Sequence, residues 1–140
     1  MSARPLRVLM IEDSLTDAML VEGELRRSSF SKFEIKRTDS LSAGLALLRD
    51  EDFDVVLLDL LLPDSVDIET VRAVHGAEPS VPIVVLSSIQ DEAVAIEAIR
   101  NGAQDYIMKG HLDGDVLALS LRFSVERHQR DSRELAPNPG

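Results

Sequence analysis

Residues 53–64 read Phe-Asp-Val-Val-Leu-Leu-Asp-Leu-Leu-Leu-Pro-Asp. The aliphatic run within them is typical of a strand that is buried on both faces of a sheet. The run reaches a carboxylate, Asp59, and Pro63 then stops the strand or a short extension of it, because proline has no N–H to donate. Ligands bind at the carboxyl ends of strands in open parallel sheets. Asp59 is therefore a candidate functional residue, although a lone aspartate more often starts a turn or caps a helix.

The composition is that of one ordinary domain. The chain has 140 residues, of which 44% are hydrophobic, with no cysteine, three scattered histidines and a formal net charge of −10. Without cysteine there is no disulfide framework and no thiolate chemistry, and the negative charge argues against a nucleic-acid-binding surface. We find no apolar run long enough to span a membrane and no signal peptide at the amino terminus. We therefore expect a cytoplasmic protein.

Strand-like and helix-like segments alternate along the whole chain. Strands are predicted at 6–11, 33–37, the central run, 83–86 and 104–108. Ser14 and Ser40 are candidate N-caps of the first two helices. A third helix is expected through Val74 with Gly76 ending it, a fourth over 91–101, and a last helix from about Asp113 to Arg130. Residues 1–130 form one predicted domain, and 131–140 are predicted to be a disordered tail.

This β-α unit, repeated five times, predicts the α/β class. Strands that alternate with amphipathic helices form a parallel sheet with helices on both faces. We therefore expect a doubly wound, five-stranded, flavodoxin-like (βα)5 fold. The most apolar runs, in the first, third and fourth strands, place those strands in the middle of the sheet.

Polar side chains follow the strands at their carboxyl ends. They are Glu12, Asp13, Asp59, Ser87, Ser88 and Lys109. Clustered carboxylates repel one another unless a cation joins them, and oxygen ligands favour Mg²⁺. A lysine and a hydroxyl nearby suit the oxygens of a phosphoryl group. This set of residues indicates an acyl-phosphate site with an aspartate nucleophile, and no glycine-rich nucleotide-binding motif competes with it.

With these motifs the chain resembles the receiver domain of two-component response regulators, from about Leu6 to Arg130. The matching motifs are Ile-Glu-Asp-Ser at 11–14, Leu-Leu-Asp-Leu-Leu-Leu-Pro-Asp at 57–64, Leu-Ser at 86–87 and Gly-Ala-Gln-Asp-Tyr-Ile-Met-Lys at 102–109. The resemblance implies the strand order 2-1-3-4-5, for which a member of that family is a standard example.

The resemblance also implies a role for each matching residue. Asp59 would be the phosphoacceptor, Asp13 would bind Mg²⁺ directly, Glu12 would act through water, and the Leu61 backbone carbonyl would complete the protein ligands. Ser87 and Lys109 would each hold a phosphoryl oxygen. Tyr106 would be the switch aromatic, which turns inward when Ser87 is drawn to the phosphate.

Some positions depart from the family pattern. Asp67 stands where receivers usually have a glycine, and it tolerates a positive φ less well than glycine does. Gly110 follows the active-site lysine where many receivers have a proline, so a looser loop is expected there. Ser88 is small, so we expect the phosphate to stay accessible to partners and water.

The last helix carries more apolar residues than one stripe needs. Leu112, Val116, Leu119 and Phe123 form a stripe, and Leu117 and Leu121 widen it. One interpretation is a wide buried face. The other is that the excess joins the helix at 91–101 and the strand at 104–108 in a surface for a protein target or a homodimer.

The function expected from these features is a phosphoacceptor in a His-to-Asp phosphorelay. A sensor histidine kinase or phosphotransfer protein would donate the phosphoryl group, and the protein would catalyse only its own phosphorylation and dephosphorylation. Nucleic acid and membrane are not expected partners. The alternatives are a scaffold that works without phosphorylation, a receiver fragment of a longer regulator, and a phosphohydrolase. The hydrolase usually needs a second acid two residues after the nucleophile, where this chain has Leu61.

Overall fold

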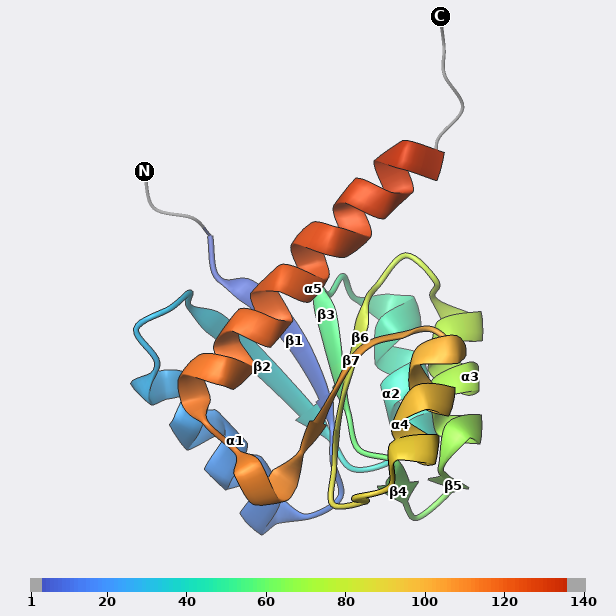
Figure 1. The fold of residues 1–140 in the computed structure, drawn as a ribbon, viewed down its shortest axis with the longest axis horizontal. Helices are drawn as coiled ribbons and strands as arrows, with labels where there is room; N and C mark the ends of the chain where they lie inside the picture. Colours follow the sequence, from blue (N-terminus) through green and yellow to red (C-terminus); the bar gives the residue numbers. More distant parts are fainter. Residues whose placement is uncertain (1–3, 136–140) are drawn as a thin grey trace, which may run out of the picture.

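A single parallel sheet runs through the centre of the molecule (Figure 1). The structure, a computed structural model, describes residues 4–135. The sheet contains β1 (Leu6–Ile11), β2 (Phe33–Thr38), β3 (Val55–Leu58), β6 (Ile83–Ser87) and β7 (Ala103–Met108). Their spatial order is β2-β1-β3-β6-β7. With the strands renumbered, this is the predicted 2-1-3-4-5 order, and the predicted flavodoxin-like fold is confirmed.

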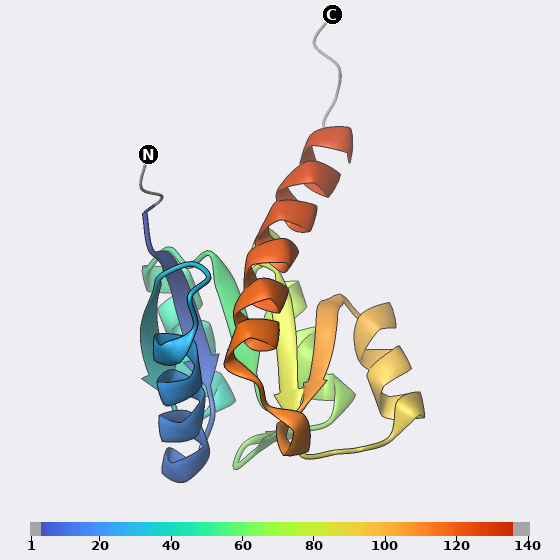
Figure 2. The ribbon, with the colours of Figure 1, turned by 60° about the vertical axis from the view of Figure 1, so that its left-hand side comes forward.

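Five helices cover the two faces of the sheet. The helices α1 (Leu15–Arg27) and α5 (Gly114–Leu135) pack together on one face. The helices α2 (Leu41–Asp50), α3 (Ile68–Ala77) and α4 (Glu92–Arg100) cover the other, as Figure 2 shows. Among residues 4–135, no helix has the combination of length and hydropathy that a bilayer crossing requires.

The central strands are aliphatic throughout because both of their faces are buried. Val55 and Leu57 belong to the cluster under α1 and α5, whereas Val56 and Leu58 belong to the cluster under α2, α3 and α4. Alternate residues of a strand point to opposite faces, so a sheet covered on both sides needs apolar residues at every position. This places a fully buried strand directly before Asp59.

Side-chain caps fix where the helices begin. The Ser14 hydroxyl accepts the Asp17 N–H, the Ser40 hydroxyl accepts the Ala43 N–H, and the Asp91 carboxylate accepts the Ala93 N–H. Each bond satisfies one of the backbone donors that a helix start leaves free. The candidate caps Ser14 and Ser40 are therefore confirmed.

The end of α3 differs from its prediction. Gly76 lies inside the helix, which continues to Ala77, and the Glu78 N–H closes the last turn on the Val74 carbonyl at 3.0 Å. Pro79 explains the stop, because the residue before a proline is disfavoured in the helical region. Glu78 accordingly has φ −148° and ψ 81°.

The last helix is longer than predicted, and a different stripe is buried. The helix continues through residues 131–135, so the prediction of a disordered tail was wrong for that stretch. No helix breaker occurs there before Pro137. Residues 136–140 of the predicted tail lie outside the described part of the chain. The residues expected to widen the stripe, Leu117 and Leu121, are completely buried. Val116 and Phe123 of the expected stripe are 58% and 50% exposed, so the wide buried face was wrong for them.

Two short strands after Asp59 form a hairpin that was only partly anticipated. β4 (Leu61–Leu62) pairs antiparallel with β5 (Ser65–Val66) across the Pro63–Asp64 turn. The expected short extension before Pro63 is therefore present, but it pairs with the chain that follows it and leaves the main sheet. The loop after Lys109 is a 3₁₀ turn over Lys109–His111.

Candidate functional site

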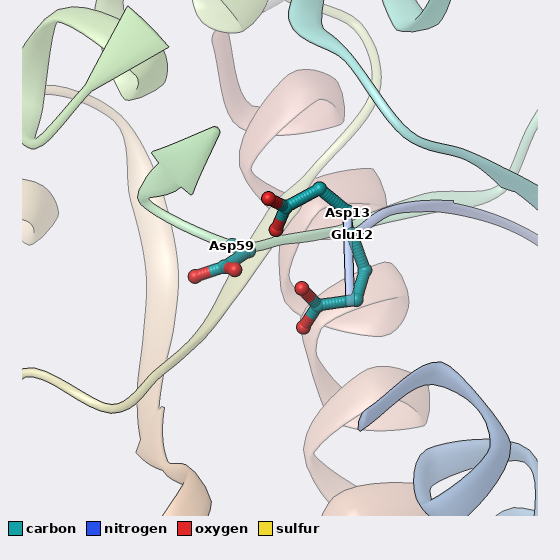
Figure 3. A group of neighbouring side chains, drawn as sticks. All are labelled: Glu12, Asp13 and Asp59. Atoms are coloured by element: carbon teal, nitrogen blue, oxygen red, sulfur yellow. The ribbon is translucent and has the colours of Figure 1, made fainter. Parts of the chain in front are cut away.

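Three carboxylates meet at the carboxyl end of the sheet (Figure 3). Glu12 and Asp13 follow β1, and Asp59 follows β3. Each offers an oxygen that lies within 4.8 Å of the others; Glu12 and Asp59 are buried, and Asp13 is exposed. The group is thus open on the Asp13 side and closed on the sheet side.

The strand register explains why these carboxylates meet. Ile11 of β1 is opposite Leu58 of β3, so the next residues of both strands emerge at the same level. The Asp59 N–H donates to the Ile11 carbonyl at 3.0 Å, which continues the β1–β3 ladder past the assigned strands. Asp59 is therefore fixed by the sheet itself.

Arg37, at the end of β2, supports the Glu12–Asp13 turn. Its Nε donates to the Glu12 carbonyl at 3.0 Å, and its terminal nitrogen donates to the Asp13 carbonyl at 3.3 Å. The half-buried guanidinium thereby orders the backbone that presents both carboxylates. No sequence pattern predicts this contact, since Arg37 is one polar residue of an alternating strand.

Lys109 reaches the carboxylates from the start of the 3₁₀ turn that follows β7. Its ammonium lies 2.6 Å from Glu12 Oε1, 2.7 Å from Asp17 Oδ2 and 3.4 Å from Asp59 Oδ2. Burial alone would lower the pKa of this amine, but the hydrogen bonds to Asp17 and Glu12 and the Asp59 charge outweigh burial and raise the pKa. Lys109 is therefore a permanent cation within the site.

The carboxyl group of Glu12 is buried and has a raised pKa. Burial, followed by the neighbouring Asp59, raises the pKa of Glu12 to about 7, against the opposing contacts from Lys109 and the Ser14 N–H. Glu12 is 3% exposed, so its charged form lacks most of the hydration that stabilises a carboxylate in water. A divalent cation would relieve this repulsion, and the all-oxygen donor set suits Mg²⁺.

Ser87 and Tyr106 lie beside the site and both contact one loop residue, Ile89. The buried Ser87 hydroxyl accepts the Ile89 N–H at 3.0 Å, and the half-buried Tyr106 hydroxyl donates to the Ile89 carbonyl at 2.7 Å. Within residues 4–135, neither hydroxyl bonds to the acidic group. The structure therefore links the two residues to each other through Ile89 and not to Asp59.

The loop after Asp59 is held at both ends by backbone contacts. The Leu61 N–H donates to Asp59 Oδ1 at 3.3 Å. The Asp64 carboxylate accepts the N–H groups of Ser42 at 3.0 Å and Leu41 at 2.8 Å, and these bonds lower the pKa of Asp64. Asp64 therefore caps α2 from another segment, a role that its place beside Pro63 did not reveal.

Asp67 adopts a conformation with positive φ, which favours glycine. Its φ is +55° and its ψ is −138°, and its side chain makes no cap bond to α3. An L-residue held there costs about 1–3 kcal/mol. The chain thus keeps a strained residue in the loop that follows the candidate nucleophile.

Asp67→Gly is expected to stabilise the protein by about 1 kcal/mol, because relief of the strain exceeds the extra chain entropy of an unfolded glycine. The measurement is the urea midpoint. Asp67→Ala is the matched control, since alanine also lacks the carboxylate but retains the strain. An equal gain in both variants would trace the effect to the lost charge and contradict a backbone origin.

A hollow of about 440 Å³ lies at the opposite end of the sheet. It is lined by residues from the end of α1 and the start of β2, among them Leu25, Lys32 and Phe33. The acidic group is remote from it, at the carboxyl ends of the strands. The hollow is therefore not the place where the acidic residues could act together.

Comparisons with known proteins agree with this geometry. A family model described as "Response regulator receiver domain" matches residues 8–120. The transcriptional regulatory protein ZraR of Klebsiella oxytoca is 27% identical over 139 residues, which cover 99% of this chain and 30% of ZraR. The cell cycle transcriptional regulator CtrA of Caulobacter vibrioides is 32% identical over 113 residues, which cover 81% of this chain and 48% of CtrA.

Solved structures share the fold. The signal receiver domain of an HD domain-containing protein from Pseudomonas fluorescens Pf-5 has a TM-score of 0.81 at 20% identity, with 96% of this chain and 97% of that chain covered. NtrX from Brucella abortus has a TM-score of 0.79 at 25% identity, with 95% and 30% covered. The present chain thus spans less than half the length of ZraR, CtrA and the NtrX chain.

Proposed function

This chain belongs to the response regulator receiver domain family, and we propose that Asp59 is its phosphoacceptor in a His-to-Asp phosphorelay. The observation that carries the proposal is the position of Asp59. Its carboxylate is 5% exposed, lies with Glu12 and Asp13 in one acidic group, and has the Lys109 ammonium 3.4 Å away. The proposed donor is the phosphohistidine of a sensor histidine kinase or a phosphotransfer protein.

The proposed cofactor is Mg²⁺. Asp13 and Asp59 would bind it through carboxylate oxygens and Glu12 through water, and the Leu61 carbonyl would complete the protein ligands. Once bound, the ion would supply positive charge that offsets the charge of the carboxylates and the phosphoryl oxygens. The close approach of three carboxylates supports this assignment.

The residues of the chain supply the rest of the reaction. An Asp59 oxygen forms the new bond to phosphorus while the bond from phosphorus to the donor imidazole nitrogen breaks. Lys109 would hold one phosphoryl oxygen, and the Ser87 hydroxyl would hold another after it leaves Ile89. Fixed donors of this kind stabilise the charge that the transferring group carries. The protein then catalyses only its own phosphorylation and dephosphorylation and acts on no separate substrate.

The proposed switch passes from Ser87 to Tyr106 through Ile89. A Ser87 hydroxyl drawn to the phosphoryl group would release the Ile89 N–H, and Tyr106 is bonded to the carbonyl of that same residue. A change in this loop would reach α4, whose cap Asp91 lies two residues further on. Two discrete arrangements of the loop would give phosphorylation a structural readout.

The proposed output surface combines α4, β7 and α5. Ser120 of α5 donates to Asp105 of β7, so the neighbouring Val116 and Phe123 lie on the β7 side of α5. Both are exposed, as are Ile96 and Ile99 of α4. Apolar residues on this surface suit a protein target or a second copy of the chain. We propose a cytoplasmic protein whose partners include neither nucleic acid nor a membrane.

Three alternatives differ from this proposal in class or in extent. A scaffold that is never phosphorylated would have no use for the charged group around Asp59. A receiver that forms part of a longer regulator is compatible with the partial coverage of ZraR and CtrA, and it would carry the same site chemistry. A phosphohydrolase is disfavoured because Leu61 occupies the position of the usual second acid.

Incubation with acetyl phosphate and Mg²⁺ is expected to add one phosphoryl group to the intact mass. Asp59→Asn is expected to abolish the adduct, because the amide is not a nucleophile, and EDTA is expected to do the same. Asp64→Asn is the matched control, since it removes a carboxylate that caps α2 and should leave the adduct intact. No adduct on the wild-type chain would favour the scaffold, and multiple turnover of small phosphate esters would favour the hydrolase.

A further inference from the structure

Asp17 is the one carboxylate on Lys109 that stands outside the candidate metal group. Lys109 touches Glu12, Asp17 and Asp59, but the group able to share an ion contains Glu12, Asp13 and Asp59. An ion bound there would draw Glu12 and Asp59 toward itself and leave Asp17 as the counter-ion of Lys109. Neither the family motifs nor the strand ends assign Asp17 a role.

The position of Asp17 is well defined. It lies in the first turn of α1, where its N–H is held by the Ser14 hydroxyl at 3.2 Å. Its Oδ2 accepts a Lys109 proton at 2.7 Å, which is much closer than the 3.4 Å contact of Lys109 with Asp59. The side chain of Asp17 is 37% exposed, whereas that of Lys109 is 16% exposed. The ammonium is thus held more firmly by Asp17 than by the candidate nucleophile.

We propose that Asp17 is a positioning residue that keeps Lys109 partly away from Asp59. In this position Asp17 strengthens the binding of a cation to the acidic group and weakens the binding of a phosphoryl group to Asp59. The inference rests on the function proposed above. Lys109 has three protons to donate, and Glu12 and Asp17 take two of them at short distance. A phosphoryl group on Asp59 is left with the third proton of an ammonium that lies 3.4 Å from Asp59 Oδ2, and it also meets the negative charge of Asp17.

Loss of the Asp17 charge should therefore change the affinity for Mg²⁺ and the affinity for a phosphoryl group in opposite directions. Without the Asp17 charge, Lys109 moves toward Glu12 and Asp59, where it repels Mg²⁺ and attracts phosphoryl oxygens. A partly exposed ion pair changes each affinity by about two- to fivefold. Damage to the site would instead weaken both ligands together.

The test uses Asp17→Asn, which keeps the shape and one acceptor oxygen but removes the charge. We expect the Kd of Mg²⁺ alone to rise, and the apparent Kd of beryllofluoride, a mimic of the aspartyl phosphate, to fall at saturating Mg²⁺, each by about two- to fivefold. Glu22→Gln, elsewhere on α1, is the control for net charge and should change neither constant. Asp17→Ser, which removes the contact altogether, should shift both in the same directions as Asp17→Asn.

Other outcomes overturn the proposal. Weaker binding of both ligands, or no change in either, would show that Asp17 does not hold Lys109 in this way. So would an equal effect of Asp17→Asn in a Lys109→Met background, because the influence of Asp17 is expected to act through Lys109. If wild-type protein and Asp59→Asn both failed to bind beryllofluoride, the proposed function itself would be wrong. If the wild type bound it and Asp59→Asn did not, the proposed function would stand, and a failed prediction for the Asp17 variants would contradict only the role of Asp17.

Discussion

Glu12→Gln is expected to stabilise the metal-free protein by about 2–3 kcal/mol at pH 8 and to change its stability little at pH 4. Burial, with Asp59 beside it, raises the pKa of Glu12 from 4.5 to about 7. The folded state therefore holds this proton more tightly than the unfolded state does. As the pH rises from 4.5 to 7, the wild-type protein loses stability, and above that window the penalty is constant. Glutamine never ionises and avoids the penalty.

Urea unfolding in EDTA across this pH range measures the difference. Glu34→Gln, which removes an exposed carboxylate of β2, is the control and should show no such pH dependence. A gain from Glu12→Gln that is the same at pH 4 and pH 8 would mean that ionisation is not its cause. Saturating Mg²⁺ at pH 8 is expected to reverse the order, because a ligand stabilises the folded state more when it binds more tightly, and Glu12→Gln removes a carboxylate from the proposed ion site.

The sheet was predictable because its strands are constrained from both sides. Residues such as Val56 and Leu57 must be apolar whichever way they point, so a continuous aliphatic run has one interpretation. The start of α1 was predictable for a local reason, since Ser14 caps it by a bond within four residues. The end of α3 was not predictable from Gly76, because a helix tolerates a glycine. The residues around it, such as Pro79, decide whether the helix ends there.

The orientation of α5 depends on contacts that its own sequence does not contain. Leu117 and Leu121 form one apolar stripe, and Val116 and Phe123 form another beside it. The sheet selects the first stripe, and the Ser120–Asp105 bond to β7 fixes the rotation. Two apolar stripes on one helix cannot be ranked by periodicity alone.

The candidate site was predictable where it follows strand ends and not elsewhere. Glu12, Asp13, Asp59 and Lys109 each follow or end a strand, so topology alone brings them to one edge of the sheet. Asp17 and Arg37 lie within a helix and a strand, in positions typical of solvated charges. Asp17 lies in the first turn of α1, three residues after its cap Ser14, where an acid is expected for helix capping alone.

Lys109→Met is expected to destabilise the metal-free protein by about 2–4 kcal/mol at pH 8, because among residues 4–135 it removes the only cation paired with two buried carboxylates. The side chains of Glu12 and Asp59 are 4% and 5% exposed, so water replaces the lost contacts poorly. Lys36→Met, which breaks an exposed pair with Glu51, is the control and should cost no more than about 1 kcal/mol. Urea unfolding with and without Mg²⁺ measures both variants.

Charge and packing make different predictions for this variant. If charge is the cause, Mg²⁺ should restore much of the stability of Lys109→Met, since the ion brings positive charge to the same carboxylates. The loss should also shrink toward pH 5, where Glu12 holds its proton. Addition of Glu12→Gln should recover part of the loss, because it removes one of the two carboxylates left without a partner. A loss that Mg²⁺, pH and Glu12→Gln all leave unchanged would show that the lysine stabilises the fold through its aliphatic chain.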